Sequence, residues 1–322
     1  MAFIPAIQYL MNNINFYQKY GYLHLKGFYT PNYVHDIRKI IFDFHQSSHK
    51  TELGNRVGLP MEILSYPSLS ELILNKKLIN TAESVLKGPV SYFGNSTIVV
   101  GPGSKGFHRD CLSQNNLTSI EWQNKEYKLI HYNAYLQPSD NLSGGIKILP
   151  KSHYSKIYKI VHNLNSLAGS KSFESKIRKI LIGFENLKWK YFSLGYIPSI
   201  AIGDSILWNF RTTHSGGAMR LKSFKNLTLP TFIENITPDS YFRPGNDQDR
   251  IQVSIVLGSE SNELRRYMES RRQAASNVKC WKISKPWSQE IISKAQKVGL
   301  NLIKPSEEFG SEYQPCKFSQ IK

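Results

Sequence analysis

The feature that most constrains the fold is the sequence pattern of residues 90–258, where short β-rich runs alternate with turns rich in glycine, proline and asparagine. The runs are Ser91–Val100, Lys128–Leu136, Ile146–Leu149, Ser205–Phe210 and Arg250–Leu257. Strands at this spacing, separated by turn residues, are typical of an antiparallel sandwich or barrel. Helical periodicity precedes this region of the chain and returns after residue 260. We therefore expect a mainly β protein with flanking α-helices.

The chain has 322 residues, which is long enough for one large domain with a sizeable core. We expect a single domain, 1–322, because no internal repeat or low-complexity linker divides it. Within it we expect a helical N-terminal segment, 1–89, and a β-core, 90–258. A helical insertion, 155–185, and a second insertion, 217–248, that can serve as a lid interrupt the core, and C-terminal helices, 259–322, follow it.

Several flanking elements can be predicted individually. Gly21–Phe28 alternates between polar and apolar residues, which predicts a half-buried strand. Thr30 and Pro31 are a typical cap and first-turn residue for a helix over Tyr33–Phe44. The spacing of apolar residues predicts three more helices, over 69–87, Glu260–Ser276 and Pro286–Val298.

The formal net charge is +17, from 41 Lys and Arg against 24 Asp and Glu. Such a charge is compatible with nucleic acid, a membrane surface or an anionic small substrate. Because the lysines are scattered, we prefer a lysine-rich background without functional meaning. The sequence contains no apolar run of about 18 residues, so we expect no membrane-spanning helix. The three cysteines form no CxxC pair, and the first residues show no secretory pattern, so we expect a cytoplasmic protein.

The pair His108 and Asp110 is the first candidate for chemistry. Residues i and i+2 of a strand project from the same face, so the imidazole and the carboxylate can reach one ion. One further histidine would complete two nitrogens and one oxygen on a single triangular face. That set leaves open positions and suits non-haem Fe(II).

His214 is the preferred third ligand among the nine histidines. It follows the run Gly203–Thr213, a turn and then a β-rich stretch, and it precedes a glycine-rich exit that would leave space beside the ligand. His131 lies within a strand, His153 in a polar turn and His162 in the helical interruption. The sequence therefore predicts a metal site made of His108, Asp110 and His214.

Four segments, in order, resemble the phytanoyl-CoA dioxygenase (PhyH) family of Fe(II)/2-oxoglutarate-dependent oxygenases. They are the opening Phe16–Tyr29, the His108-x-Asp110 motif, Ser143–His153 and Gly203–His214. Lys151 stands where that family usually has glycine. The resemblance covers roughly residues 14–258. It implies a double-stranded β-helix, the cupin-like jelly roll, which agrees with the β-rich pattern in the middle of the chain.

The same resemblance implies Fe(II) as cofactor, with 2-oxoglutarate and O2 as co-substrates. The implied reaction is hydroxylation of a small-molecule substrate with release of succinate and CO2. Related halogenases lack the carboxylate ligand, so Asp110 favours hydroxylation, although desaturation and cyclisation stay open. The sequence does not name the substrate, and an anionic one would fit basic residues near the site.

The resemblance further implies an arginine that binds the distal carboxylate of 2-oxoglutarate. Arg250 begins a predicted strand and would face inward with Gln252 and Ser254, so we prefer it. Arg220, six residues after His214, is the alternative. Tyr132 matches the aromatic position that lines the family's co-substrate pocket, although a packed strand aromatic is an equal interpretation.

Two other functions stay open from the sequence. The charge of +17 is compatible with an oxidative demethylase that acts on nucleic acid. The irregular arginine spacing is compatible with a non-catalytic jelly-roll binding protein whose metal site has lapsed.

Overall fold

The structure is a computed structural model of the full chain. The residues that it describes are 13–47, 57–59, 63–100, 107–111, 126–137, 145–154, 180, 184, 195–218, 221–222, 229, 231–241, 251–278 and 287–303.

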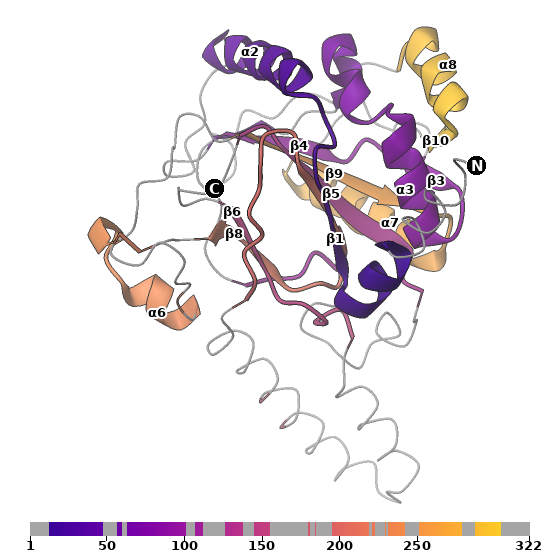
Figure 1. Ribbon diagram of the computed structural model, residues 1–322. Helices are drawn as coiled ribbons and strands as arrows, with labels where there is room; N and C mark the ends of the chain where they lie inside the picture. The colour runs from indigo at the N-terminus through magenta and orange to yellow at the C-terminus, as the bar shows by residue number, and fades with distance from the viewer. Residues whose placement is uncertain are drawn as a thin grey trace, which may run out of the picture.

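A large sheet forms the centre of the molecule (Figure 1). Its strands run in the order β1 (Tyr22–Leu25), β7 (Ser205–Asn209), β5 (Leu129–Tyr135), β9 (Ile251–Gly258), with β3 (Val90–Tyr92) and β4 (Ser96–Val100) both beside β9. At the far edge, β2 (Val57–Leu59) pairs with β4 and β10 (Leu300–Leu302) pairs with β3. All of these pairings are antiparallel except that of β3 with β10.

A second sheet pairs β6 (Gly145–Ile148) with β8 (His214–Ala218). Two antiparallel bridges extend it, one between His108 and His214 and one between Ile148 and Tyr196. Residues of both sheets line one cavity, so the sheets face each other, and Figure 1 shows β6 and β8 across from β5 and β1. A jelly roll is built of two facing antiparallel sheets, and this arrangement agrees with it. The prediction of a mainly β, double-stranded β-helix fold with flanking helices is confirmed.

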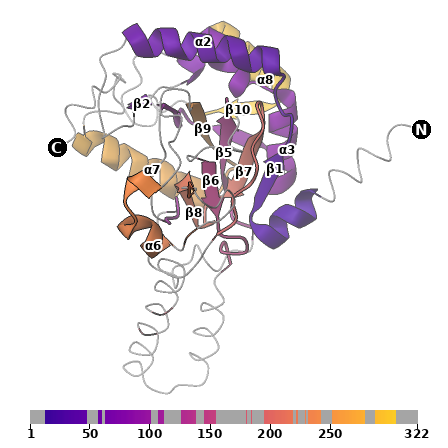
Figure 2. The same ribbon diagram turned by 60° about the vertical axis from the view of Figure 1, so that its left-hand side comes forward.

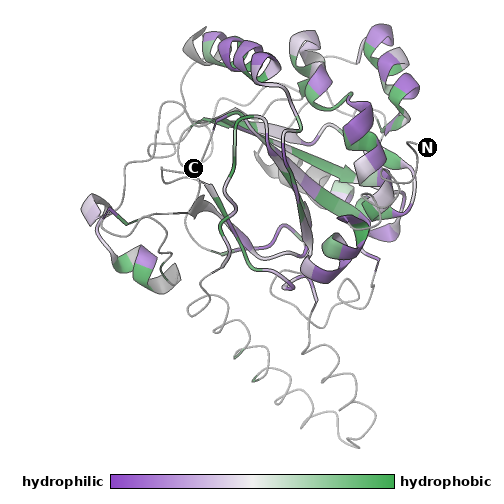
Figure 3. Ribbon diagram, in the orientation of Figure 1, coloured by the Kyte–Doolittle hydropathy of each residue, from purple (hydrophilic) through white to green (hydrophobic). Residues whose placement is uncertain are grey.

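Helices α2 (Pro31–Ser47), α3 (Lys76–Leu86) and α8 (Gln289–Val298) gather on one side of the large sheet (Figures 1 and 2). Their solvent sides are largely hydrophilic, whereas the central strands are hydrophobic (Figure 3). Helix α7 (Asn262–Val278) packs through Leu264 and Tyr267 against a separate cluster that includes Phe210. The helices therefore cover the apolar surface that the sheet presents.

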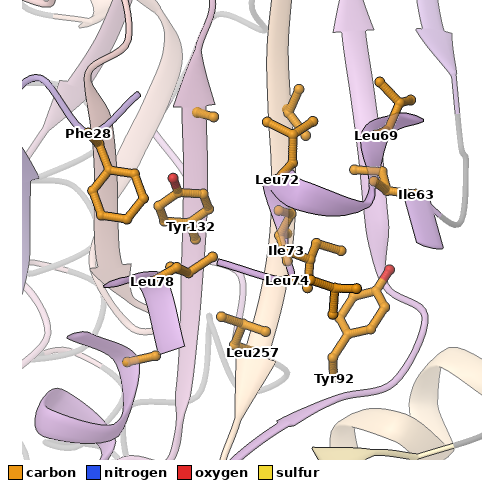
Figure 4. Packing of buried hydrophobic residues seen from close by; sticks show 14 of the residues in the cluster. Phe28, Ile63, Leu69, Leu72, Ile73, Leu74, Leu78, Tyr92, Tyr132 and Leu257 are labelled. Atoms are coloured by element: carbon orange, nitrogen blue, oxygen red, sulfur yellow. The ribbon is translucent and has the colours of Figure 1, made fainter. Parts of the chain in front are cut away.

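Strand alternation divides the large sheet into two chemically different faces. Ile130, Tyr132 and Ala134 of β5 belong to the main hydrophobic cluster, together with apolar residues of α2, α3 and α8. Figure 4 shows Phe28, Leu78 and Tyr132 within this cluster. The alternate residues of the same strand point to the opposite face, where the cavity lies.

The predicted flanking elements are mostly present. The strand predicted in Gly21–Phe28 is β1, and Thr30 Oγ1 accepts a 3.3 Å hydrogen bond from the Tyr33 amide at the start of α2. The helix predicted over 69–87 is shorter than expected. Asn75 caps a new helix by accepting from the Lys77 and Leu78 amides, so α3 begins at Lys76 and the preceding residues form the 3-10 helix η2 (Pro67–Leu72). A second short 3-10 helix, η1 (Ile63–Ser65), precedes it.

Of the two predicted insertions, 155–185 lies outside the described residues apart from 180 and 184. Within 217–248, the structure describes α6 (Thr231–Ile236) and the 3-10 helix η5 (Asp239–Tyr241). Glu234 of α6 forms a buried ion pair with Lys147 of β6. A lid function for this segment stays a prediction. No helix in the described regions of the chain is long and apolar enough to cross a lipid bilayer.

The tight turn before β7 depends on Gly203. Its φ is +83°, and a Cβ there would lie 2.2 Å from the Tyr29 carbonyl oxygen. We expect Gly203→Ala to lower the free energy of unfolding by about 3 kcal/mol, because strain and overlap add. The matched control is Gly27→Ala, since Gly27 has φ +54° but nothing within 4 Å of its Cβ position. Its cost should be about 1 kcal/mol, and equal losses in urea denaturation would contradict the overlap.

Candidate metal centre

The structure brings His108, Asp110 and His214 together. One potential ligand atom from each residue lies within 4.8 Å of the others. His108 and His214 are neighbours across the second sheet, and each backbone amide donates to the other's carbonyl oxygen at 2.9 Å. Their ring centroids are 4.4 Å apart. Backbone pairing therefore sets the distance between the two imidazoles before any ion is considered.

The turn before β8 is fixed by hydrogen bonds within it and to other segments of the chain. Asn209 Oδ1 accepts a hydrogen bond from the Arg211 amide at 3.0 Å, and the Thr213 amide donates to Ser152 Oγ at 2.8 Å. Arg109 Nε donates to Thr213 Oγ1 at 2.9 Å. Thr212 Oγ1 also donates to the Gly21 carbonyl oxygen at 2.8 Å, so all four sequence segments that carry the family resemblance meet at this turn. Together they position His214.

The Asp110 carboxylate lies between His214 and two residues of the large sheet. Its Oδ2 is 3.6 Å from His214 Nε2 and accepts a 3.2 Å hydrogen bond from Trp208 Nε1. The same oxygen is 2.7 Å from His131 Nδ1, and the other ring nitrogen of His131 contacts Ser254 Oγ.

The sequence patterns do not predict His131 and Trp208 as residues of the site. The signal for His131 is its strand position. It shares a face with polar Asn133 and alternates with apolar Ile130 and Tyr132. Trp208 is buried, as expected for a core residue, but its indole nitrogen also donates to Asp110.

The ionisation of His214 and Asp110 suits metal binding. Burial lowers the pKa of His214 to about 4, although the Asp110 charge acts in the opposite direction. Burial raises the pKa of Asp110, but His214, His131 and His108 outweigh it and hold that pKa well below its usual range. At neutral pH His214 therefore keeps a free lone pair and Asp110 stays a carboxylate, which are the forms that bind a cation.

A cavity of about 180 Å3 opens beside the three residues. The large sheet lines it with Thr97, Val99, His131, Asn133, Tyr135, Trp208, Gln252 and Ser254, and the second sheet and its extension with His108, Asp110, Ile146, His214 and Gly216. Asn133 is 1% exposed, and its side-chain oxygen has no hydrogen-bond partner in the described regions of the chain. The cavity is thus polar at its wall and has room for a small ligand beside an ion.

The other predicted site residues have different outcomes. Ser254 lines the cavity, as expected for an inward residue of β9. Tyr132 does not line it, and its prediction as a pocket residue is corrected. Its ring is fully buried on the opposite face of β5, and its hydroxyl bonds to Tyr29 and Ser205 at 2.9 and 2.8 Å. Arg250 and Arg220 lie outside the described residues.

Two imidazole nitrogens and one carboxylate oxygen on one side of a cavity can bind a divalent transition metal and leave positions for exogenous ligands. Among the described residues, this is the group of histidine, cysteine and acidic side chains close enough together to hold an ion. The assignment of His108, Asp110 and His214 as ligands rests on this geometry.

No family model and no curated protein matches the chain. Solved structures are similar to it at low identity. The non-heme alpha ketoglutarate dependent epimerase SnoN from nogalamycin biosynthesis is 14% identical, with 79% of this chain and 84% of that chain covered and a TM-score of 0.49. EctD from S. alaskensis, solved with 2-oxoglutarate and 5-hydroxyectoine, is 13% identical, with 78% and 76% covered and a TM-score of 0.46.

HygX from Streptomyces hygroscopicus, solved with nickel and 2-oxoglutarate, is 12% identical, with 77% of this chain and 86% of that chain covered and a TM-score of 0.47. These TM-scores are below 0.5, so any function proposed for this chain rests on the geometry of its own site. Membership of the phytanoyl-CoA dioxygenase family stays a prediction from the four sequence segments.

Trp208 offers a direct report of metal binding, because its ring centroid lies 4.7 Å from that of His214. We expect Co(II) to quench some of the tryptophan fluorescence and Trp208→Phe to remove most of that quenching while Co(II) still binds. Trp287→Phe is the matched control, since Trp287 is buried beside Tyr92 in the main core. Quenching that survives in Trp208→Phe would place the ion elsewhere.

Proposed function

We propose that this protein is an Fe(II)/2-oxoglutarate-dependent oxygenase. The observation that carries the proposal is the convergence of His108, Asp110 and His214 at the wall of a polar cavity between two sheets. A two-histidine, one-carboxylate face is the donor set that suits Fe(II) with open positions for a co-substrate and dioxygen.

The residues present fit the iron. His214 is neutral, Asp110 is ionised, and no rearrangement of the backbone is needed to bring their ligand atoms within 4.8 Å of each other and of His108. Trp208 and His131 contact the carboxylate from the large sheet, so Asp110 is held at the cavity wall. Outer hydrogen bonds of this kind orient metal ligands.

The cavity also fits a small polar co-substrate. Asn133, Gln252 and Ser254 line it, and the Asn133 amide oxygen is buried without a described partner. A buried polar atom without a partner is costly, so a polar ligand or water at this place would stabilise it. When bound, Fe(II) and 2-oxoglutarate would supply oxidation by dioxygen coupled to release of succinate and CO2.

We propose that Arg250 binds the distal carboxylate of 2-oxoglutarate, with Ser254 beside it. Gln252 and Ser254 both line the cavity, and Arg250 has the same parity in the sequence as these two residues of β9. A guanidinium can bind a carboxylate through two parallel hydrogen bonds. Arg220 is the alternative for this role.

The finer reaction that we propose is hydroxylation of a small-molecule substrate. Asp110 occupies the place that a halide would need, and a cavity of about 180 Å3 leaves little room beyond a co-substrate. The substrate would therefore approach from outside this volume. An anionic substrate, a nucleic-acid substrate and a purely binding role stay predictions based on charge and on the arginine spacing.

The central test is turnover of 2-oxoglutarate. Purified protein with Fe(II) should form succinate, and without oxygen it should show the charge-transfer absorption of 2-oxoglutarate chelated to Fe(II). Asp110→Ala should lower both signals at least about 100-fold, because it removes the only anionic ligand of the three. Asp36→Ala is the control, since that carboxylate is exposed on α2. Succinate formed without iron, or equally by Asp110→Ala, would refute the proposal.

The choice between the arginines needs its own comparison. We expect Arg250→Gln to raise the KM for 2-oxoglutarate about 100-fold, as expected for loss of a bidentate charged contact of about 2.7 kcal/mol. Arg220→Gln should change it less than about threefold, a difference below about 1 kcal/mol. The reverse result would assign the contact to Arg220.

A further inference from the structure

We propose that His131 is a positioning residue, which holds the Asp110 carboxylate in its metal-binding orientation by a hydrogen-bond chain that begins at Ser254. This inference rests on the proposed function, since it concerns how this chain prepares one of the three ligands. Neither the sequence motifs nor the resemblance assigns any role to His131.

The position of His131 is rigidly defined. Its backbone lies in the middle of the large sheet, paired with Trp208 of β7 and Val256 of β9. Its ring lies 4.7 Å from the Trp208 ring and 5.8 Å from the Phe210 ring, and 16% of the side chain is exposed. An imidazole held between two strands and two aromatic rings has little freedom to follow Asp110, so the carboxylate must adapt to the histidine.

The two ring nitrogens of His131 have different partners. A carboxylate oxygen accepts hydrogen bonds, so the His131 Nδ1–H donates to Asp110 Oδ2 across the 2.7 Å contact. On the other side of the ring, Nε2 contacts Ser254 Oγ, and a hydroxyl can either donate to a ring nitrogen or accept from it. Ser254 therefore holds the far side of the imidazole, which keeps Nδ1–H directed at Asp110.

Two donors on the same oxygen define the orientation of the carboxylate. Asp110 Oδ2 accepts from His131 and from Trp208 Nε1, and this places it 3.6 Å from His214 Nε2. One hydrogen bond would still allow the carboxylate to swing about the contact, whereas two donors from different strands fix it. Loss of the His131 donor should therefore change both the affinity for a metal and the symmetry of its ligand field.

The chain contains a second histidine–aspartate pair that serves as an internal control. His24 Nε2 lies 2.7 Å from Asp204 Oδ2, the same separation as in the site, and 13% of its side chain is exposed. Asp204 also accepts from the Gly27 and Ala201 amides, so this pair organises the turn before β7. Breaking it should affect stability without touching the cavity.

The experiment compares His131→Leu, His131→Asn and His24→Leu in Co(II) titrations of metal-free protein, with the visible absorption spectrum as second readout. We expect His131→Leu to weaken Co(II) binding about 10- to 100-fold and to change the spectrum. His131→Asn should weaken Co(II) binding by less than about 10-fold, below the range for loss of an outer partner, because its amide nitrogen can take the place of Nδ1–H. His24→Leu should lower the melting temperature but leave the Co(II) affinity and spectrum unchanged.

Another readout needs no metal. In 15N-histidine NMR spectra of the metal-free protein, His131 should carry its proton on Nδ1, and Ser254→Ala should reduce the population of that tautomer. Equal Co(II) affinity and spectrum in wild type and His131→Leu, equal losses in His131→Leu and His131→Asn, or an Nδ1 of His131 that carries no proton would each overturn the inference alone. A wild-type protein that binds no Co(II) would refute the proposed function and this inference with it.

Discussion

Two backbone hydrogen bonds between His108 and His214 are the constraint on which the site depends. They join the short segment 107–111, which lies between β4 and β5 in the sequence, to His214, the first residue of β8. Because each residue both donates and accepts, the pair closes the second sheet and places two imidazoles side by side. The geometry of the proposed metal site is therefore a consequence of sheet closure, and a chain that failed to close the sheet would lose this geometry at the same time.

The large sheet supplies the rest of the site, because it separates the apolar core on one of its faces from the polar cavity on the other. On β5, Ile130, Tyr132 and Ala134 lie in the apolar core, whereas His131 and Asn133 face the cavity. A one-residue shift of register would bury two polar side chains among leucines and expose Tyr132 to the cavity. The helices that cover the apolar face thus fix the register, and the register keeps His131 beside Asp110.

Much of the fold could be predicted because its signals are local. The β-rich runs correspond to β3–β7 and β9, and the cap at Thr30 marks the start of α2. The two-residue spacing of His108 and Asp110, together with the glycine-rich exit after His214, identifies three residues that the fold brings together. These signals need only the geometry of a strand and the preferences of turn residues.

The errors concern properties that depend on partners distant in sequence. Resemblance alone assigns Tyr132 to the pocket, although its parity on β5 matches the apolar residues that pack against α3. A position within a strand argues against His131 as a site residue, and only the pairing of β5 with β7 and β9 shows that its ring reaches Asp110. The break before α3 depends on Asn75 accepting from two amides, which local apolar spacing does not reveal.

The ion pair of Lys147 with Glu234 has a consequence for any attempt to replace the segment around α6. Both side chains are almost fully buried, and Lys147 Nζ also donates to the Leu229 carbonyl oxygen at 3.2 Å. Removing either partner alone would leave a buried charge without its counter-charge, which is destabilising. Exchanging both residues for apolar ones need not be destabilising. The segment around α6 and strand β6 must therefore be changed together. A loop from another protein that replaces this segment would need an acidic residue in the place of Glu234, or a substitution of Lys147 as well.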